Sequence, residues 1–456
     1  MTALWTSAEI AAATGGTPSA SFDVTGVTFD SREVRAGDLF VAMPGTAHDG
    51  HQFVAGAFEQ GAAAALVSRP VDGPHVLVAD TFAALHALAR AARERCSATI
   101  IGVTGSVGKT STKEALFAAL GRVAPGRTHR SVRSYNNHTG VPLSLARMPR
   151  DCTFAVLEMG MNHAGEIAQL TALVRPDVAL ITAIAPAHIE MLGSLEAIAD
   201  AKAEIFAGLV PDGIAIIPND SEFRDNLVKA ARRTADRIVT FGGGDADVHA
   251  VHAVAEGQGS LITAALLERE LTFTIAQRGD HWVSNALAVL AAVEAVGADV
   301  AVAGLALADM GGLKGRGERH IVALGAGSAL LIDESYNANP ASMAATLASL
   351  GEEREVERRI AVLGPMRELG GHSDSLHAGL APAVIAAKVD ELILIGAEME
   401  PLAAAVGSAA TLARAANVDD ATAKLLAMLR PGDAVLVKAS NTVGLAKLVD
   451  RVTRGR

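Results

Sequence analysis

The chain has 456 residues, half of them apolar, so at about 150 residues per domain it can form three domains that each bury a core. Its net charge of −11, without a basic block, argues against sequence-independent binding to nucleic acids. The two cysteines are isolated, which argues against a disulfide framework and a zinc site. No apolar run reaches about 18 residues and the chain has no cationic start, so we expect neither a membrane span nor a signal peptide. We therefore expect a cytoplasmic protein.

The first half of the chain alternates short apolar strands with helices. This alternation predicts a parallel sheet wrapped by helices. The expected elements are strands at 37–43, 62–68, 98–105, 154–160, 177–184 and 213–220, and helices at 81–96, 110–123 and 194–209.

An alanine-rich, helical stretch at residues 281–310 ends in the glycine-bearing segment DMGGLKGRGERH, where we place a domain boundary. Beyond it the alternation resumes and predicts a second, Rossmann-like sheet. Its strands are expected at 330–336, 358–364, 390–396 and 433–440.

The stretch Gly102–Glu114, GVTGSVGKTSTKE, lies between an expected strand and an expected helix. Gly105 and Gly108 allow backbone N–H groups to turn toward a phosphate, and the helix dipole adds positive potential. Lys109 would neutralise the β- and γ-phosphates, and the Thr110 hydroxyl would bind Mg²⁺. The first glycine stands one position earlier than the strict motif requires, yet the strand–loop–helix context favours nucleotide binding over a purely structural turn.

Three further residues suggest a second cation site. Glu158 closes an expected strand and His188 follows the next one, so both belong at the carboxyl edge of the sheet, where ligands bind. Lys202 falls on the apolar stripe of its helix, four residues after Ile198 and three before Ile205. A desolvated lysine loses its proton readily, and the neutral amine can capture carbon dioxide as a carbamate. The alternatives are a surface histidine and a lysine that snorkels to solvent.

At these residues the chain resembles the Mur ligase family, the ATP-dependent amide-forming enzymes of peptidoglycan precursor synthesis. The family loop TGSxGKT appears as TGSVGKT, and its metal-binding Glu, His and carbamylated Lys match Glu158, His188 and Lys202 in the AKAEI run. The stretches NNHTGVPLSLARMP, EMGMNHAGEI, DESYNANPASM and the closing VLVKAS extend the resemblance over nearly the whole chain. They are most similar to the member that adds D-alanyl-D-alanine.

The resemblance implies an α/β fold with three domains. Residues 1–97 would bind the UDP end of the substrate, residues 98–312 would form a central P-loop ATPase-like domain with a parallel sheet, and residues 313–456 would form a Rossmann-like domain. The implied protein is a monomer.

The implied reaction joins D-alanyl-D-alanine to UDP-N-acetylmuramoyl-tripeptide through an acyl phosphate, with ADP and phosphate as products. The third tripeptide residue would be diaminopimelate or lysine. The implied cofactors are ATP, two Mg²⁺ (with Mn²⁺ as an alternative) and a carbamate on Lys202. An oxygen-rich ligand set with one imidazole suits these ions better than zinc.

The resemblance also assigns roles to individual residues, for which loop or capping hydrogen bonds are the simpler alternative. The catalytic residues would be Lys109, Glu158, His188 and Lys202, and the metal ligands Thr110, Glu158, His188 and Lys202. The nucleotide would contact Gly105, Ser106, Val107, Gly108, Lys109, Thr110, Ser111, Asn285, Arg316, Asp333, Glu334 and Asn337. The substrates would contact Ser31, Arg32, Asn136, Asn137, Asn162, His163, Lys438 and Ser440.

Four residues depart from the family pattern. Glu334 stands where an aspartate is usual, Pro365 replaces an acidic residue, Trp282 replaces an asparagine, and Asn441 stands where an arginine often follows VKAS. Contacts to the ribose and to the substrate carboxylate are therefore the ones expected to differ in this chain.

Two other functions compete with this interpretation. A sister ligase, either the tripeptide-forming one or one like folylpolyglutamate synthase, shares the loop, but YNANP and NNHTGVPL favour the dipeptide-adding member. A nucleotide-gated switch would use the loop as a sensor and form no bond. Glu158, His188 and Lys202 argue against a switch, which has no use for a second metal.

Overall fold

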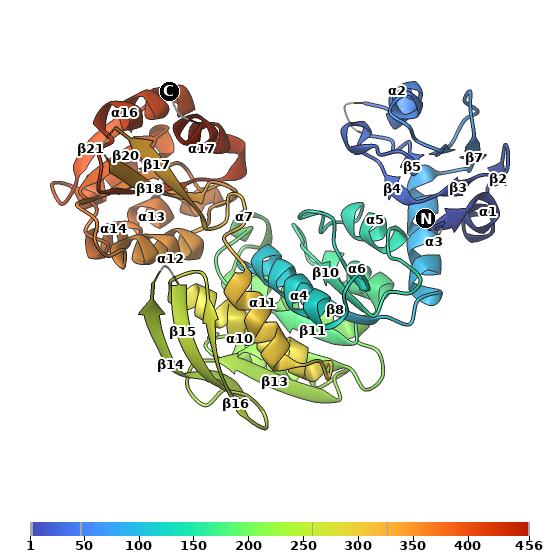
Figure 1. Ribbon diagram of the computed structural model, residues 1–456, viewed down its shortest axis with the longest axis horizontal. Helices are drawn as coiled ribbons and strands as arrows, with labels where there is room; N and C mark the ends of the chain where they lie inside the picture. Colours follow the sequence, from blue (N-terminus) through green and yellow to red (C-terminus); the bar gives the residue numbers. More distant parts are fainter. Residues whose placement is uncertain (1–2, 46–47, 258, 326, 455–456) are drawn as a thin grey trace.

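The computed structural model describes residues 3–45, 48–257, 259–325 and 327–454. The described chain forms three α/β bodies, built around sheets of five, nine and six strands (Figure 1). In Figure 1 the N-terminal body, in blue, and the C-terminal body, in orange and red, lie on opposite sides above the central body. The predicted α/β fold with three domains is confirmed.

The N-terminal sheet has the order β2-β7-β6-β5-β4, and β1 pairs with β3 beside it. Helices α1 and α3 pack on one face of the sheet and α2 on the other. The elements are β1 (Trp5–Thr6), α1 (Ser7–Thr14), β2 (Thr17–Pro18), β3 (Asp23–Val24), β4 (Gly26–Thr28), the 3-10 helices η1 (Ser31–Glu33) and η2 (Gly50–Phe53), β5 (Asp38–Val41), α2 (Val54–Glu59), β6 (Ala64–Val67), β7 (His75–Leu77) and α3 (Thr81–Glu94).

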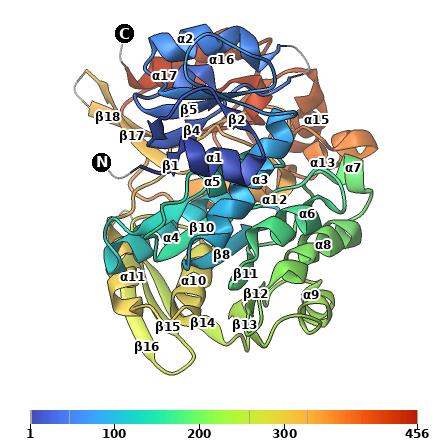
Figure 2. The ribbon, with the colours of Figure 1, turned by 90° about the vertical axis from the view of Figure 1, so that its right-hand side faces the viewer.

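The central sheet has the order β16-β15-β14-β13-β12-β11-β8-β10-β9. Strands β8 to β14 run parallel to one another, and β15 pairs antiparallel with both β14 and β16. Figure 2 shows its helices on both faces, with α4, α10 and α11 on one side and α6, α8 and α9 on the other. The strands are β8 (Thr99–Thr104), β9 (Thr128–Arg130), β10 (Phe154–Glu158), β11 (Val178–Ile181), β12 (Ile214–Pro218), β13 (Arg237–Gly242), β14 (Val248–Glu256), β15 (Gly259–Ala265) and β16 (Glu270–Ile275). The helices are α4 (Lys109–Val123), α5 (Gly140–Ala146), α6 (Glu166–Val174), α7 (Ile189–Leu192), α8 (Leu195–Ala203), η3 (Glu204–Gly208), α9 (Arg224–Ala231), α10 (Asp280–Ala295) and α11 (Val300–Asp309).

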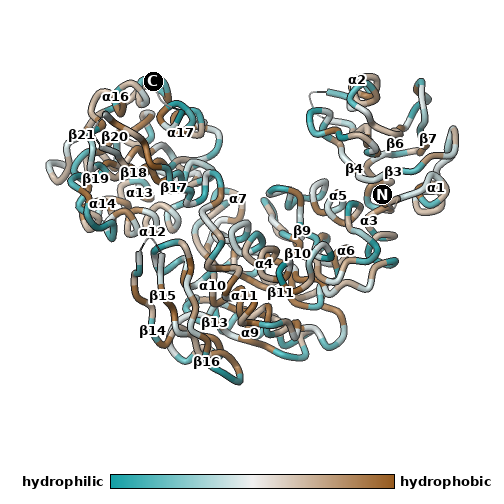
Figure 3. The backbone as a smooth tube through the Cα atoms, in the orientation of Figure 1, coloured by the Kyte–Doolittle hydropathy of each residue, from teal (hydrophilic) through white to brown (hydrophobic). Residues whose placement is uncertain are grey.

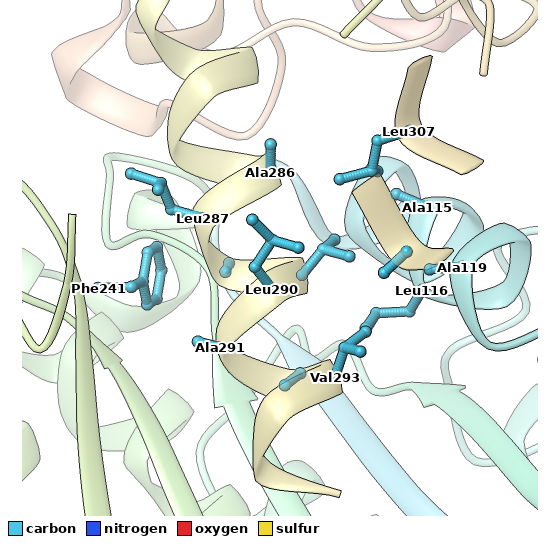
Figure 4. Close-up of a cluster of buried hydrophobic side chains, with 14 of the residues drawn as sticks. Ala115, Leu116, Ala119, Phe241, Ala286, Leu287, Leu290, Ala291, Val293 and Leu307 are labelled. Atoms are coloured by element: carbon cyan, nitrogen blue, oxygen red, sulfur yellow. The ribbon is translucent and has the colours of Figure 1, made fainter. Parts of the chain in front are cut away.

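Helix α10 is the centre of the core that supports the phosphate loop. Every residue from Ala286 to Val293 is buried, because this helix is apolar on all sides and is enclosed by the sheet, α4 and α11. Figure 4 shows Leu290 of α10 among side chains of α4 and Leu307 of α11, with Phe241 of β13 on the other side of the helix. This packing fixes α4, and with it the loop at the N-terminus of α4.

The central domain also completes the core of its N-terminal neighbour. Leu143 and Ala146 of α5 belong to the cluster that contains Trp5 and Ile10, and the Trp5 indole N–H donates to the Ala146 carbonyl at 2.8 Å. The N-terminal domain is therefore seated on α5 by an apolar interface.

The C-terminal sheet has the order β17-β18-β22-β19-β20-β21, parallel except for β17. Figure 3 shows the hydrophobic stretch of β18 inside this domain, with hydrophilic segments on its outer loops. The elements are β17 (Glu318–Leu324), β18 (Gly327–Glu334), α12 (Pro340–Gly351), β19 (Arg358–Leu363), η4 (Gly370–His372), α13 (Ser373–Ala378), α14 (Ala381–Ala386), β20 (Glu391–Ile395), η5 (Ala397–Met399), α15 (Glu400–Val406), β21 (Thr411–Ala415), α16 (Val418–Met428), β22 (Asp433–Lys438), η6 (Asn441–Val443) and α17 (Ala446–Thr453).

Three features differ from the sequence prediction. The single helical stretch expected at 281–310 is two helices, because Gly297 adopts a left-handed φ of 70° and Asp299 caps α11. The helix expected at 194–209 tightens into 3-10 geometry after Ala203. The antiparallel strands β14 to β16 were not predicted. Within the described residues, no helix is both long enough and apolar enough to cross a bilayer.

Candidate active site

A cavity of about 420 Å³ lies between the central and C-terminal domains. Its walls come from the phosphate loop, the ends of β10 and β18, the start of α10 and the loop before α12. The predicted site residues that line it are Ser106, Val107, Gly108, Lys109, Thr110, Ser111, Asn136, Asn137, Glu158, Asn162, His188, Asn285, Arg316, Glu334, Asn337 and Lys438.

The phosphate loop is held in place by the segment that follows β11. Gly105 and Gly108 have φ values of 146° and 83°, which L side chains rarely adopt. The Thr182 hydroxyl donates to Val107 O at 2.5 Å, and the Ser106 hydroxyl donates to Ala185 O at 2.9 Å. Helix α4 then begins at Lys109 without a side-chain cap, so its first N–H groups remain available for an anion.

Lys109 is folded back onto its own loop, where its ammonium donates to Gly105 O at 2.6 Å. Burial lowers the pKa of Lys109; the negative charge of Glu158 opposes this shift, and the positive charge of Arg316 adds to it. A phosphate between Lys109 and Arg316 would relieve their mutual repulsion. Lys109 of the loop and Arg316 of the C-terminal domain thus bring two positive charges to the same cavity.

Glu158 is the centre of a polar cluster at the end of β10 and is 1 % exposed. Its carboxylate accepts from the Thr110 hydroxyl at 2.9 Å and from the Asn136 amide at 2.8 Å. Lys113 Nζ lies 3.8 Å from Glu158 Oε2 and donates to backbone carbonyls of the loop before Asn136, including Ser131 O at 3.4 Å. A buried carboxylate beside a hydroxyl and an amide side chain suits Mg²⁺, so these residues fit the expected ion.

His188 lies at the start of α7 with a left-handed φ of 62°. Its Nδ1 lies 2.5 Å from Oε2 of Glu368, which belongs to the C-terminal domain. The contact with His188 lowers the pKa of Glu368, which therefore stays ionised. His188 thus reaches the cavity with a carboxylate partner from another domain.

Lys202 is placed inside the protein, as the sequence predicted, and does not snorkel. Its side chain is 1 % exposed, and the structure gives its ammonium neither a hydrogen bond nor an ion pair among the described residues. Burial lowers the pKa of Lys202 well below its ordinary value, and the charge of Lys109 lowers it further. It stands behind the cavity wall and does not line the cavity.

The C-terminal domain adds a second set of charges. The Arg316 guanidinium lies over the Tyr336 ring, 4.0 Å from its centroid. Lys438 is buried and donates to Glu334 Oε2 at 3.3 Å and to Asn337 O at 3.0 Å. Burial lowers the pKa of Lys438, although Glu334 counteracts the shift.

Two predicted nucleotide or substrate residues of this domain lie outside the cavity lining. Asp333 is 1 % exposed and accepts the backbone N–H groups of Gly315 and Ser335, both at 3.0 Å. The Ser440 hydroxyl accepts from the Arg367 N–H at 2.9 Å. Both side chains hold loops at the cavity rim, and their predicted ligand contacts stay predictions.

The remaining predicted substrate residues are dispersed. Asn137 Oδ1 accepts the N–H of Gly140 at 2.9 Å and so supports the start of α5, while His163 lies outside the cavity lining. Ser31 and Arg32 lie in η1 of the N-terminal domain, where the exposed Arg32 guanidinium is paired with Asp30 at 2.6 Å. The structure therefore does not bring these two residues to the cavity.

Sequence reasoning missed several residues of the site. Lys113 belongs to the quoted TSTKE run, so its spacing from Lys109 along α4 could have indicated it. Tyr336 lies within the motif DESYNANPASM quoted above, whereas no local pattern marks Glu368. The Tyr336 hydroxyl meets the Ser134 hydroxyl and joins the two domains beside the cavity.

Two of the four departures from the family pattern, Trp282 and Glu334, line the cavity, and Pro365 does not. Trp282 lines the cavity and faces Gly317, where an added Cβ would come within 2.9 Å of its ring. Pro365 O accepts the Ser440 N–H at 3.1 Å, a backbone contact that the side chain at 365 does not alter.

Comparison with known proteins gives consistent matches along the chain. Residues 23–96 match the Mur ligase family catalytic domain, residues 103–293 the Mur ligase middle domain, and residues 315–441 the Mur ligase glutamate ligase domain. The chain is 35 % identical to the UDP-N-acetylmuramoyl-tripeptide--D-alanyl-D-alanine ligase of Synechocystis sp., over 94 % of this chain and 92 % of that one. The chain belongs to the Mur ligase family.

The fold of this Mur ligase agrees with solved structures over its full length. It matches the crystal structure of MurF from Acinetobacter baumannii with a TM-score of 0.86 and 30 % identity, covering 99 % of both chains. It matches the MurF ligase of Thermotoga maritima in complex with ADP with a TM-score of 0.79 and 27 % identity, covering 94 % of this chain and 97 % of that one.

Proposed function

We propose that this Mur ligase uses ATP to join D-alanyl-D-alanine to UDP-N-acetylmuramoyl-tripeptide, with ADP and phosphate as products. The observation that carries the assignment is the similarity to MurF ligases over nearly the full length of both chains. The match therefore includes the N-terminal and C-terminal domains, in which sister ligases must accommodate different substrates.

The first chemical step activates the tripeptide. A carboxylate oxygen of the tripeptide attacks the γ-phosphorus of ATP, and the bond from this phosphorus to the bridging oxygen breaks. ADP is the leaving group, and the tripeptide becomes an acyl phosphate. Two anions must approach each other in this step. Lys109 and Arg316 supply the positive charge in the cavity that lowers their repulsion.

Magnesium is expected beside these residues. Thr110 and Glu158 would hold one ion, and Glu158, His188 and Lys202 in its carbamate form would hold a second; bound Mg²⁺ neutralises phosphate oxygens. Mn²⁺ would fit the same donors. Asn136 and Lys113 keep the Glu158 carboxylate fixed for this purpose.

The carbamate on Lys202 is supported by its environment. Among the described residues this buried lysine has no counter-ion, so its cationic form is unfavourable and its neutral amine is favoured. The amine attacks carbon dioxide, one N–C bond forms and one proton is released. The resulting anion would attract Lys109, whereas the ammonium repels it.

The second step forms the amide bond. The amine of D-alanyl-D-alanine attacks the acyl carbon, and the tetrahedral intermediate expels phosphate as the C–O bond breaks. Water would hydrolyse the acyl phosphate, so the cavity has to exclude it. Tyr336 and Trp282, which line the side of the cavity near the C-terminal domain, are suited to that task.

The UDP end of the substrate is proposed to bind the N-terminal domain near Ser31 and Arg32. The exposed Arg32 guanidinium would meet an anionic group such as a diphosphate. Because ATP and UDP-linked precursors are cytoplasmic, we place this reaction in the cytoplasm, and we propose that the chain acts as a monomer.

The test is phosphate release in the presence of ATP, Mg²⁺ and UDP-N-acetylmuramoyl-tripeptide across a panel of acceptors. We expect turnover with D-alanyl-D-alanine and none without an acceptor, with Lys109→Met as an inactive control. Equal rates with D-glutamate or a diamino acid would assign a sister ligase. Turnover of ATP without any acceptor would favour the nucleotide switch.

A further inference from the structure

The C-terminal domain contacts the predicted metal ligand His188 through one short segment. Glu368 presents its carboxylate to His188 Nδ1 at 2.5 Å, and its backbone carbonyl accepts the Glu190 N–H at 3.2 Å. Two residues later, Gly370 packs on Glu190 so closely that an added Cβ would lie 3.1 Å from the Glu190 side chain. Side-chain and backbone contacts therefore hold the same two segments together.

Both partners of this contact have an unusual backbone. His188 has a φ of 62° and Glu368 a φ of 63°, although neither is glycine. Such conformations are strained in residues other than glycine and persist where the surroundings hold them in place. The positive φ on each side indicates that the surrounding structure holds both segments in place.

The chemistry of the pair is that of a supported metal ligand. A histidine that binds a metal through one ring nitrogen usually donates its other N–H to a carboxylate, which fixes the tautomer and makes the ligand more basic. With Nδ1 facing Glu368, Nε2 is the ring nitrogen that is left for a metal in the cavity that His188 lines. The carboxylate, however, belongs to a different domain from the other predicted ligands.

We propose that Glu368 is a positioning residue that completes the second metal site from the C-terminal domain, so that this site reaches full affinity only when the domains are in contact. This inference rests on the proposed function. Its consequence is that the acyl phosphate forms only in a cavity that the C-terminal domain has already covered.

The test measures Mn²⁺ binding to the full chain by electron paramagnetic resonance of free Mn²⁺, with an ATP analogue that cannot be hydrolysed. For Glu368→Gln we expect the weaker of two Mn²⁺ sites to lose about tenfold or more in affinity, with the tighter site unchanged. Glu190→Gln removes a carboxylate from the same interface without touching His188, and we expect both affinities to stay at wild-type values. In a His188→Ala background, Glu368→Gln should cause no further loss, because Glu368 acts through His188.

Several outcomes would overturn the proposal. Unchanged Mn²⁺ affinities in Glu368→Gln would show that the contact only joins the two domains. Tighter Mn²⁺ binding would show that Glu368 competes with the metal for His188. Additive losses in the double variant would show that Glu368 acts independently of His188. Each of these results leaves the acceptor assay of the wild type intact, whereas a wild type that makes no product refutes the proposed function itself.

Discussion

Replacing Gly105 by alanine should strongly weaken ATP binding, because this position allows no side chain. Its φ of 146° lies in a region that essentially only glycine occupies. An added Cβ would lie 1.9 Å from Thr182 Oγ1 and 3.1 Å from Ala183 N. Thr182 cannot move aside freely, since its hydroxyl donates to Val107 O at 2.5 Å and so fixes the loop.

The expected magnitude follows from these two costs. Backbone strain of about 1–3 kcal/mol corresponds to about 5- to 150-fold in an equilibrium constant. Breaking the Thr182 hydrogen bond adds about 1 kcal/mol. In the unbound variant the loop relaxes to another conformation, which removes the strain and the clash. Nucleotide binding must then restore the phosphate-binding conformation, and the free energy needed for this weakens the observed affinity. We therefore expect the Kd for ATP to rise at least about tenfold.

Isothermal titration calorimetry with ADP and an ATP analogue measures this effect, and a melting curve checks the fold. Gly121→Ala is the matched control, because Gly121 lies in the same helix, α4, with open space around its Cα. We expect it to leave the Kd unchanged and to raise the free energy of unfolding by up to about 1 kcal/mol. A wild-type Kd in Gly105→Ala would show that this loop does not hold the phosphates.

Three further predictions concern chemistry, packing and pH. Lys202→Ala should lower activity about 100-fold or more and recover partly with formate or acetate; no recovery, together with no effect of bicarbonate on the wild type, would argue against the carbamate. Leu290→Ala should lower the free energy of unfolding, measured by urea denaturation, by about 3 kcal/mol, because this side chain is fully buried. Leu305→Ala replaces a side chain that is 61 % exposed and should change it by less than about 0.5 kcal/mol. Equal effects of the two substitutions would contradict the core described above. Burial lowers the pKa of His129 to about 4, whereas in the unfolded chain the pKa of this imidazole is about 6.5. As the pH falls from about 6.5 toward about 4, the imidazole therefore takes up a proton in the unfolded chain but not in the folded one, and stability is lost. His129 is partly accessible, so we expect a loss on the order of 1 kcal/mol between pH 7 and pH 5, and His129→Asn should reduce this dependence; an unchanged pH profile would refute the assignment.

Much of the fold was predictable because its signals are local. The apolar strands that became β8, β10, β11, β18, β19, β20 and β22 stand out as short runs between helices, and each lies where it was expected. The strands β14 to β16 did not, because their sequences contain no continuous apolar run like those of the parallel strands. The end of α10 was also missed, since it depends on a single glycine turn at Gly297.

The candidate site divides in the same way. The loop from Gly105 to Thr110 could be identified because consecutive residues form it, and buried Lys202 because the helical period places it on an apolar stripe. Asp333 and Ser440 were expected to contact ligands, but the structure engages both with backbone N–H groups at the rim of the cavity. Polar residues in a motif do not reveal whether a ligand or the protein itself satisfies them.

The sequence by itself determined that the chain binds a nucleotide in an α/β domain and which acidic, imidazole and amine groups stand at its strand ends and on its helices. Only the tertiary structure decided that Glu368 meets His188, that Tyr336 meets Ser134, and that Lys202 has no counter-ion within the part of the chain that the structure describes. The physical reason is range. Backbone periodicity and loop chemistry act over a few residues, whereas the charge and burial around a side chain are set by segments that lie far away in the sequence and come together only when the domains pack.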